Sequence, residues 1–362
     1  MYICHIIVQL MASFPTKHKT CFFPALAVLV FMSAGFLCAA QDGERGYAIV
    51  DVSCAFLRAE ADYESPLETQ EFMGAVVEVV GHDGYWVKVR TSQPYTAWCN
   101  EKCLAFTDSL GVKEWNESER YMVTAPFSRI YSRPDRSSSP VTDLCRGDIV
   151  QACCGGKGNR PVVSGKWAEV SVPGGRTGWT LRADILDYGR WRESLRSRSE
   201  DDVRKSVVRE AGEWMGVPYL WGGMSPKGFD CSGLVRYVYY MNGILLPRNA
   251  SQQAECGVDV PVFKTVVEAV GAVKPECGSG SFCPDALLPG DLLFFGTAAE
   301  GGRPARITHV GIYAGGGRMI HSSQLVRRNS LCPQDADCYE NAGRLICARR
   351  IIGCTSGNPA EL

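Results

Sequence analysis

The sequence predicts an α+β chain in which two small antiparallel β-barrels precede a larger domain that mixes helices with strands. A β pattern occurs twice in the first half of the chain, and its tryptophans lie twelve residues apart in each copy, at Trp86 and Trp98 and again at Trp167 and Trp179. Apolar residues change to helical spacing beyond residue 200 and return to alternation after residue 290. These observations together predict the fold class.

The two copies of the β pattern have the same order of parts. In the first copy, Gly74 precedes the run A-V-V-E-V-V, a turn follows at 82–84, and 85–89 alternate like a strand. In the second copy, Gly147 precedes D-I-V-Q-A-C-C, a glycine-rich turn follows, and 166–170 alternate. Short strands, glycine-rich turns and a repeat unit of about 65 residues are typical of a small antiparallel barrel.

An amphipathic helix is predicted at the start of the mixed domain. Val203, Val207, Ala211 and Trp214 follow one another at spacings of three and four, as on one helical face, and Pro218 ends the pattern. The serine- and arginine-rich segment before this helix is expected to be an exposed linker. We therefore predict five segments: an N-terminal signal over 1–40, barrels over 46–110 and 118–188, a linker over 189–204, and the mixed domain over 205–352.

The N-terminus has the pattern of a secretory signal. Lys17 and Lys19 precede an apolar stretch, and the small residues C-A-A follow it before an expected cleavage after Ala40. We expect simple export to the periplasm or the cell surface. Acylation of Cys38 is an alternative, although Leu37 is bulky where a lipoprotein signal has a small residue, and a retained membrane anchor is a third. No second spanning segment occurs, so no stable membrane span is expected after cleavage.

Composition and cysteine spacing exclude several classes of partner. The formal net charge is -1 and no sustained Lys/Arg cluster occurs outside a short run at 190–204, which also contains acidic residues, so a nucleic-acid partner is not predicted. The 17 cysteines indicate an oxidising compartment, with local disulfides predicted for Cys277/Cys283 and Cys332/Cys338. A zinc site is the alternative, but no C-x-x-C motif or neighbouring histidine pair supports it. We therefore predict no metal or other cofactor.

Two short motifs give the strongest local signal. P-Y-L-W-G-G at 218–223 is followed by G-F-D-C-S-G-L at 228–234, and apolar residues at helical spacing come next. Asp230 is a residue type that caps helix N-termini, so Cys231 is expected in the first helical turn. Free backbone N–H groups and the helix dipole favour the thiolate there, which is the reactive form of cysteine. A buried structural cysteine is the alternative interpretation.

A predicted hairpin carries two histidines. I-T-H-V-G-I-Y alternates like a strand and contains His309, a run of three glycines follows, and R-M-I-H-S returns as a second strand with His321. A loop made of the three glycines would place His321 opposite Gly311 and put both imidazoles on one face. A plain two-residue loop would place them on opposite faces unless a bulge intervened. The sequence favours the first arrangement.

A reactive cysteine needs a base within hydrogen-bond reach, and that base needs an orienting partner. We predict that His309 takes the proton of Cys231 and that His321 fixes the tautomer and ring angle of His309. Two structural histidines with satisfied hydrogen bonds are the alternative. His82 lies in a predicted barrel turn and is expected to be exposed, without a role.

These features resemble the NlpC family of papain-like cell-wall cysteine peptidases, over roughly 205–350. The matching segments are Y-L-W-G-G, F-D-C-S-G-L, L-P-R, L-P-G-D-L-L-F-F, I-T-H-V-G-I-Y and M-I-H-S. The two barrels resemble bacterial SH3-like domains, and the whole is similar to the γ-D-glutamyl-L-diamino acid endopeptidases, also called dipeptidyl-peptidase VI. The resemblance implies a triad of Cys231, His309 and His321. It also implies cleavage of L-Ala-γ-D-Glu from lysine or diaminopimelate in peptidoglycan peptides whose L-Ala amine is free.

The resemblance further implies a substrate-binding pocket in the peptidase domain. Tyr219, Trp221, Asp230 and Ser232 match positions that line this pocket in the family. A free ammonium group is stabilised by a carboxylate and by an aromatic wall, which these residues would supply. Core packing is the alternative interpretation for the two aromatic residues.

The same subgroup uses a tyrosine and an acidic residue of its first barrel to exclude longer substrates. Tyr95 matches the tyrosine. Pro66 stands where the acidic residue is expected, with Glu64 and Glu68 beside it, and Asn249 stands where the subgroup has an aspartate. These departures leave the requirement for a free amine open, unless the aspartate of the F-D-C motif meets it alone.

Two other functions stay open on the sequence. An amidase or acyltransferase would use the same triad, because a fold does not fix the bond that is broken. A non-catalytic wall-binding protein would rely on the SH3-like barrels, and the intact Cys/His/His set argues against that function.

Overall fold

The computed structural model describes residues 46–155, 160–263 and 282–354. The predicted signal over 1–40 lies outside these ranges, and so does Cys277 of one predicted disulfide. Within them, two barrel-like sheets precede a mixed helix–strand domain, which confirms the predicted α+β class. The segment boundaries given above stay predictions.

The first sheet has seven strands in the order β3-β2-β6-β5-β4-β1-β7. Alternation buries one side of each strand, so that Val77, Val87 and Val89 are almost fully enclosed. The predicted turn joins β4 to β5, where Asp83 pairs with Trp86. The elements of this part are β1 (Tyr47–Val50), β2 (Ala55–Arg58), β3 (Leu67–Glu71), β4 (Val76–Asp83), β5 (Trp86–Arg90), β6 (Thr96–Asn100), the 3₁₀ turn η1 (Glu101–Cys103), β7 (Leu104–Thr107) and α3 (Ser109–Glu117).

The second sheet repeats the strand order of the first as β10-β9-β16-β15-β11-β8-β17. Trp167 begins β15 as Trp86 begins β5, and Trp179 lies on the next strand, as Trp98 does. The twelve-residue spacing therefore places the two tryptophans at the same positions of the same hairpin in both copies. The elements are β8 (Arg120–Val123), β9 (Phe127–Tyr131), β10 (Pro140–Cys145), β11 (Ile149–Ala152), β12 (Cys154–Gly155), β13 (Arg160–Pro161), β14 (Val163–Ser164), β15 (Trp167–Ser171), β16 (Thr177–Leu181), η2 (Arg182–Asp184) and β17 (Ile185–Asp187).

A helix occupies much of the segment that composition predicts to be an exposed linker. α4 (Tyr188–Arg196) is capped by Asp187, whose Oδ1 accepts from the Arg190 N–H at 2.8 Å. The helix buries Trp191, whose ring lies 5.6 Å from that of Tyr188 and 6.2 Å from that of Tyr240. The serine- and arginine-rich composition of this segment gives no sign of the buried Trp191.

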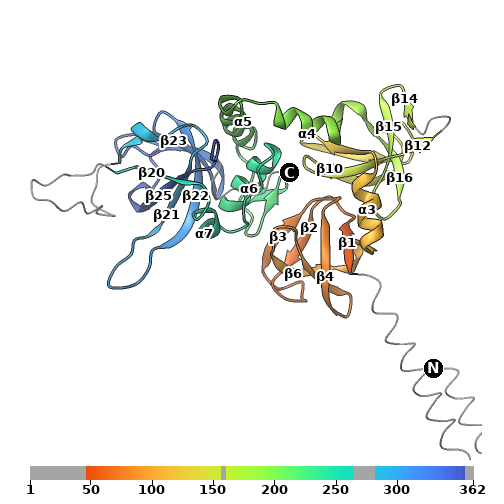
Figure 1. Cartoon of the computed structure of the whole chain (residues 1–362), viewed down its shortest axis with the longest axis horizontal. Helices are drawn as coiled ribbons and strands as arrows, with labels where there is room; N and C mark the ends of the chain where they lie inside the picture. Colours follow the sequence, from red (N-terminus) through yellow and green to blue (C-terminus); the bar gives the residue numbers. More distant parts are fainter. Residues whose placement is uncertain (1–45, 156–159, 264–281, 355–362) are drawn as a thin grey trace, which may run out of the picture. The chain divides into compact units, whose positions relative to one another are not determined.

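Helices α5 and α6 pack on one six-stranded antiparallel sheet, of order β20-β25-β21-β22-β23-β24 (Figure 1). α5 buries Val207 and Ala211, as the spacing predicts, and Trp214 at its C-cap. The elements are α5 (Glu200–Glu213), β18 (Met224–Ser225), β19 (Gly228–Phe229), α6 (Cys231–Met241), α7 (Ala250–Gln253), β20 (Val258–Val260), η3 (Pro284–Ala286), β21 (Leu292–Thr297), β22 (Arg306–Gly315), β23 (Arg318–Ser323), β24 (Leu325–Ser330), η4 (Ala342–Arg344) and β25 (Leu345–Arg350).

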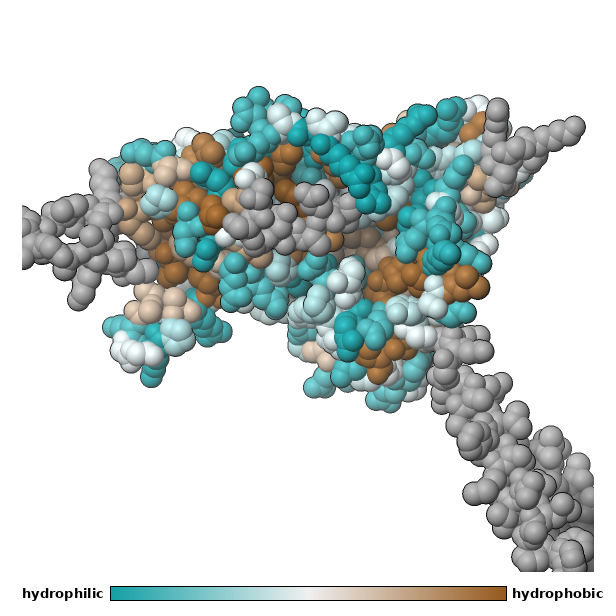
Figure 2. Space-filling view, in the orientation of Figure 1, coloured by the Kyte–Doolittle hydropathy of each residue, from teal (hydrophilic) through white to brown (hydrophobic). Residues whose placement is uncertain are grey.

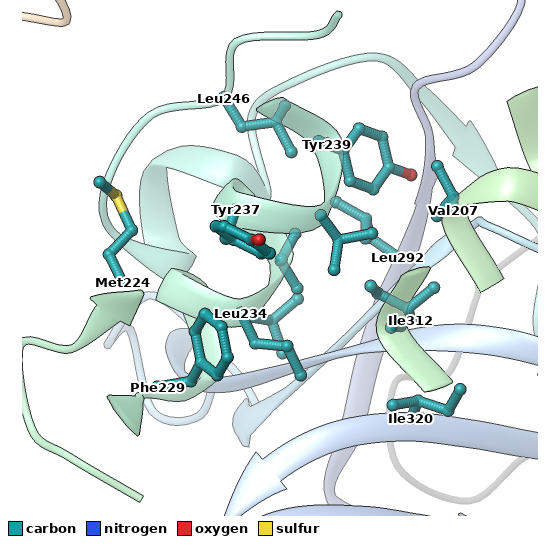
Figure 3. Close-up of a cluster of buried hydrophobic side chains, with 14 of the residues drawn as sticks. Val207, Met224, Phe229, Leu234, Tyr237, Tyr239, Leu246, Leu292, Ile312 and Ile320 are labelled. Atoms are coloured by element: carbon teal, nitrogen blue, oxygen red, sulfur yellow. The ribbon is translucent and has the colours of Figure 1, made fainter. Parts of the chain in front are cut away.

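The largest core lies between α6 and this sheet. Leu234, Tyr237 and Tyr239 of α6 are fully buried and belong to one cluster with Leu292 and Ile312 of the strands (Figure 3). α6 is enclosed along most of its length rather than along one stripe, which is typical of a central helix. Burial therefore holds the first turn of α6 in place against β22.

The turn between β22 and β23 differs from the predicted three-residue loop. Ile312 pairs with Ile320, whereas Gly315 faces Arg318, so the register shifts by one residue beside the turn. Only two residues remain in the loop, both glycines with φ of 61° and 71°, as a tight hairpin turn requires. The bulge compensates for the short loop, and both imidazoles lie on one face after all.

The predicted disulfide between Cys332 and Cys338 is absent, because both thiols are free. Cys332 Sγ instead lies 2.8 Å from Gln334 Oε1. Backbone hydrogen bonds close the loop: the Cys338 N–H donates to the Asp335 carbonyl at 3.0 Å, and the Tyr339 N–H donates to the Ser330 carbonyl at 2.8 Å.

Across the described ranges, no helix is both long enough and apolar enough to cross a membrane. On the face seen in Figure 2, apolar patches alternate with polar side chains.

Candidate active site

Cys231 occupies the first turn of α6, as the sequence predicts. Asp230 is the N-cap, and its Oδ1 accepts from the Gly233 N–H at 2.6 Å. The backbone N–H groups of Ser232 and Val310 donate to the Cys231 thiol. Because His309 precedes Val310 on β22, this hydrogen bond brings the predicted base beside the predicted nucleophile.

Burial raises the pKa of the Cys231 thiol more than the neighbouring backbone N–H groups lower it. Burial and the neighbouring Asp230 carboxylate raise the pKa of Cys231 to about 12, although the two N–H groups and the Arg248 guanidinium lower it. The resting thiol is therefore protonated, whereas the sequence predicted a thiolate. Cys231 has to lose its proton during the reaction, so a base must stand beside it.

The two predicted histidines are joined by a hydrogen bond. His309 Nε2 lies 2.7 Å from His321 Nδ1, and the rings meet edge to face with centroids 4.9 Å apart. His321 is fully buried, and its Nε2 lies 3.0 Å from Asn329 Oδ1. The structure therefore brings Cys231, His309 and His321 together, and it adds a residue that the sequence does not single out.

Both imidazoles are neutral near pH 7. Burial, with help from the neighbouring His321, lowers the pKa of His309 to about 3. Burial also lowers the pKa of His321 to about 4. Aromatic rings supply part of this enclosure: the Tyr339 ring lies 4.8 Å from His321 and 5.5 Å from His309, and Phe295 lies 6.0 Å from His309. A neutral imidazole is the form that accepts a proton.

The two aromatic residues of Y-L-W-G-G lie in different surroundings. Tyr219 is half-buried, and burial and the adjacent Cys231 and Asp230 raise the pKa of its phenol, so it lies beside the nucleophile. Trp221 is 67% exposed, which excludes core packing as the reason for its presence. An exposed tryptophan near a reactive cysteine is available to contact a bound molecule.

Asp230 and Ser232 belong to a buried network centred on Arg248. The guanidinium meets both Asp230 oxygens, through Nη2 at 2.5 Å and Nη1 at 3.1 Å. Arg248 Nη1 also donates to Ser232 Oγ at 3.0 Å, and Asp230 Oδ2 accepts from the Gly222 N–H at 3.0 Å. Arg248 belongs to the L-P-R motif, which the sequence alone does not connect to the cysteine.

Strand β3 of the first barrel lies against the same network. Arg248 Nε donates to Thr69 Oγ1 at 3.0 Å, and the Met224 N–H donates to Gln70 Oε1 at 2.7 Å. Gly222, with φ of +75°, approaches so closely that a Cβ would lie 2.4 Å from the Leu67 carbonyl oxygen. The first barrel therefore forms part of the wall beside the cysteine.

Tyr95 is brought to this wall, and its phenol donates to Glu68 Oε2. Burial, with this hydrogen bond to Glu68, raises the pKa of Tyr95 to about 12. Glu68 is thus the acidic partner that the sequence leaves undecided between two glutamates. Asn249 is exposed at the N-cap of α7, where its N–H donates to Gln252 Oε1 at 3.2 Å.

Known proteins resemble this chain in sequence and in fold. Residues 216–336 match the NlpC/P60 family, and residues 53–105 match the bacterial SH3 domain. The chain therefore carries an NlpC/P60 cysteine peptidase domain, with a bacterial SH3 domain before it. A solved NlpC/P60 family protein from Bacillus cereus ATCC 10987 has the same fold, with a TM-score of 0.62 and 23% identity over 84% of this chain and 99% of that one.

Two relatives align with most of this chain. The γ-D-glutamyl-L-lysine dipeptidyl-peptidase of Bacillus cereus (strain ATCC 10987 / NRS 248) is 29% identical over 298 residues, which cover 79% of this chain and 75% of the relative. Dipeptidyl-peptidase 6 of Lysinibacillus sphaericus is 27% identical over 278 residues, which cover 76% of this chain and 87% of the relative.

The protonated thiol predicts how Cys231 reacts with iodoacetamide. Because only the thiolate is alkylated, the rate at Cys231 should rise about tenfold per pH unit from pH 6 to pH 10 without a plateau. Mass spectrometry of the peptide that contains Cys231 measures this rate. A plateau below pH 7 would show a resting thiolate and contradict the prediction.

Proposed function

We propose that this chain is a cysteine endopeptidase that hydrolyses the bond between γ-D-glutamate and lysine or diaminopimelate in peptidoglycan-derived peptides with a free N-terminal L-Ala. The observation that carries the proposal is the array of Cys231, His309 and His321 beside a wall from the first barrel. The name of the Bacillus cereus relative gives the γ-D-glutamyl-L-lysine bond, and the alignments with both relatives extend over barrels as well as the peptidase domain.

The chemistry is acyl transfer through a thioester. His309 takes the Cys231 proton as the sulfur attacks the γ-glutamyl carbonyl, and a C–S bond forms. Backbone N–H groups at the start of α6 stabilise the oxyanion. The C–N bond then breaks, and the same proton passes from His309 to the leaving amine. Water attacks the thioester with His309 as base, and the thiol receives the proton as it leaves.

Recognition of the L-Ala ammonium falls to Glu68 in this proposal. Asp230 is not suited to bind the ammonium group, because Arg248 neutralises its carboxylate and two backbone N–H groups occupy its oxygens. Asn249 carries no charge. Within the part of the chain that the structure describes, the one side-chain hydrogen bond that Glu68 accepts comes from the Tyr95 phenol, so a cation can approach its carboxylate.

We also propose that the chain acts outside the cytoplasm, on the basis of its N-terminal sequence pattern. The protein recovered from the producing cells should then begin at Gln41, and its intact mass tests this. A mass that includes residues 1–40, or a lipid on Cys38, would contradict simple export.

Cleavage of defined peptides tests the activity. We expect release of L-Ala-D-Glu from L-Ala-γ-D-Glu-L-Lys or its diaminopimelate counterpart, and none from the N-acetylated peptides, by mass spectrometry under reductant. Cys231→Ala should abolish turnover and keep the fold, whereas the matched Cys153→Ala in the second barrel should keep wild-type turnover. Hydrolysis by Cys231→Ala near the wild-type rate would sink the assignment, and no cleavage by wild type would favour an amidase or binding role.

Removal of the Glu68 charge tests whether this residue binds the L-Ala ammonium group. Glu68→Gln should lower kcat/KM for the free-amine peptide by about tenfold to a hundredfold, mainly through KM, because a hydrogen bond to a charged group contributes about 1.5–3 kcal/mol. Glu64→Gln is the matched control, since Glu64 is exposed four residues earlier, and it should leave kcat/KM unchanged. Equal effects of both variants would remove Glu68 from the pocket.

A further inference from the structure

Asn329 is a nearly buried side chain on β24 that hydrogen-bonds on both sides. It lies opposite Met319, two pairs along the ladder from His321, so the two side chains share a face of the sheet. Its Nδ2 donates to the Asp337 carbonyl at 2.8 Å, and its Oδ1 lies 3.0 Å from His321 Nε2. A carbonyl only accepts, so the amide nitrogen must face Asp337 and the amide oxygen must face the imidazole.

This orientation determines where the imidazole protons lie. Because Asn329 Oδ1 accepts, His321 Nε2 carries a proton, and Nδ1 of the neutral ring is an acceptor. His309 Nε2, 2.7 Å away, donates to that acceptor. Nδ1 of His309 is then unprotonated, as a general base requires.

We propose that Asn329 is a positioning residue that holds His321 in its Nε2-protonated tautomer and so keeps Nδ1 of His309 free to take the Cys231 proton. This inference rests on the proposed function of the triad and deepens it by adding the group that orders its protons. The chain of hydrogen bonds ends on the backbone carbonyl of Asp337, which cannot lose or gain a proton near neutral pH.

The surroundings explain why an amide serves here better than a carboxylate. The charged and titratable groups around the pair are Arg327, Glu340, Tyr339 and the Cys231 thiol, and Arg327 Nη2 donates to Glu340 Oε1 at 2.8 Å. An amide oxygen orients an imidazole without adding charge. A carboxylate at the same place would stabilise the imidazolium and raise its pKa.

Nitrogen-15 NMR of histidine side chains in the full chain tests the tautomers without any substrate. In wild type, Nε2 of both His309 and His321 should carry the proton, and exposed His82 serves as an internal reference. Asn329→Leu should mix the tautomers of His321. A proton on His321 Nδ1 in wild type would overturn the inference. Failure of wild type to cleave peptides would instead count against the proposed function and leave this result standing.

Kinetics separate positioning from a merely structural role. Asn329→Leu should lower kcat by about tenfold or more with KM changed less than about twofold, because the wrong tautomer removes the base. Asn329→Asp keeps an acceptor and should retain activity at pH 8, but the acid limb of kcat/KM should move up by about one pH unit or more. An unmoved acid limb in Asn329→Asp would overturn the inference.

Asn242 provides a matched control at the end of α6. Its Nδ2 donates to the Val238 carbonyl at 2.8 Å and its Oδ1 accepts from Arg198 Nη1 at 2.8 Å, so it has the same pattern away from the imidazoles. Asn242→Asp should leave the acid limb of kcat/KM and the histidine spectrum unchanged. The same shift in both aspartate variants would mean a general structural effect and would overturn the inference.

Discussion

The ion pair between Arg248 and Asp230 is the interaction on which the rest of the site depends. Asp230 caps α6 and so determines where Cys231 stands, but its buried carboxylate needs a cation to offset its desolvation. The same guanidinium reaches Thr69 on β3. One side chain therefore fixes the nucleophile, the pocket wall and the edge of the first barrel.

Burial gives Cys231, His309 and His321 an uncharged resting state beside this ion pair. The thiol keeps its proton and both imidazoles stay neutral, because desolvation disfavours every charged form. In our proposal the charge forms only when a substrate brings its carbonyl to the sulfur. A chain of hydrogen bonds that starts at the Asp337 carbonyl then determines which nitrogen of His309 is unprotonated and can accept the Cys231 proton. In this proposal the nucleophile is activated by the placement of protons on the two imidazoles and not by a permanent charge.

Local sequence patterns predicted the parts of the site that lie on one element. Asp230 capping α6 and the histidines on paired strands follow from spacing and residue type. Glu68 and Asn329 did not follow, because each acts across elements far apart in the chain. Tyr95 selects Glu68, and the carbonyl of Asp337 orients Asn329. No local pattern encodes such contacts.

The sequence by itself determined the fold class, the duplicated barrel and the identity of the three groups proposed to carry the chemistry. Periodicity and turn residues express these directly, since they depend on neighbours along the chain. The tertiary structure decided the bulge that aligns His309 with His321, the protonated state of Cys231 and the hydrogen bond between Tyr95 and Glu68. Each of these depends on burial and on contacts between distant segments, which exist only once the chain has folded.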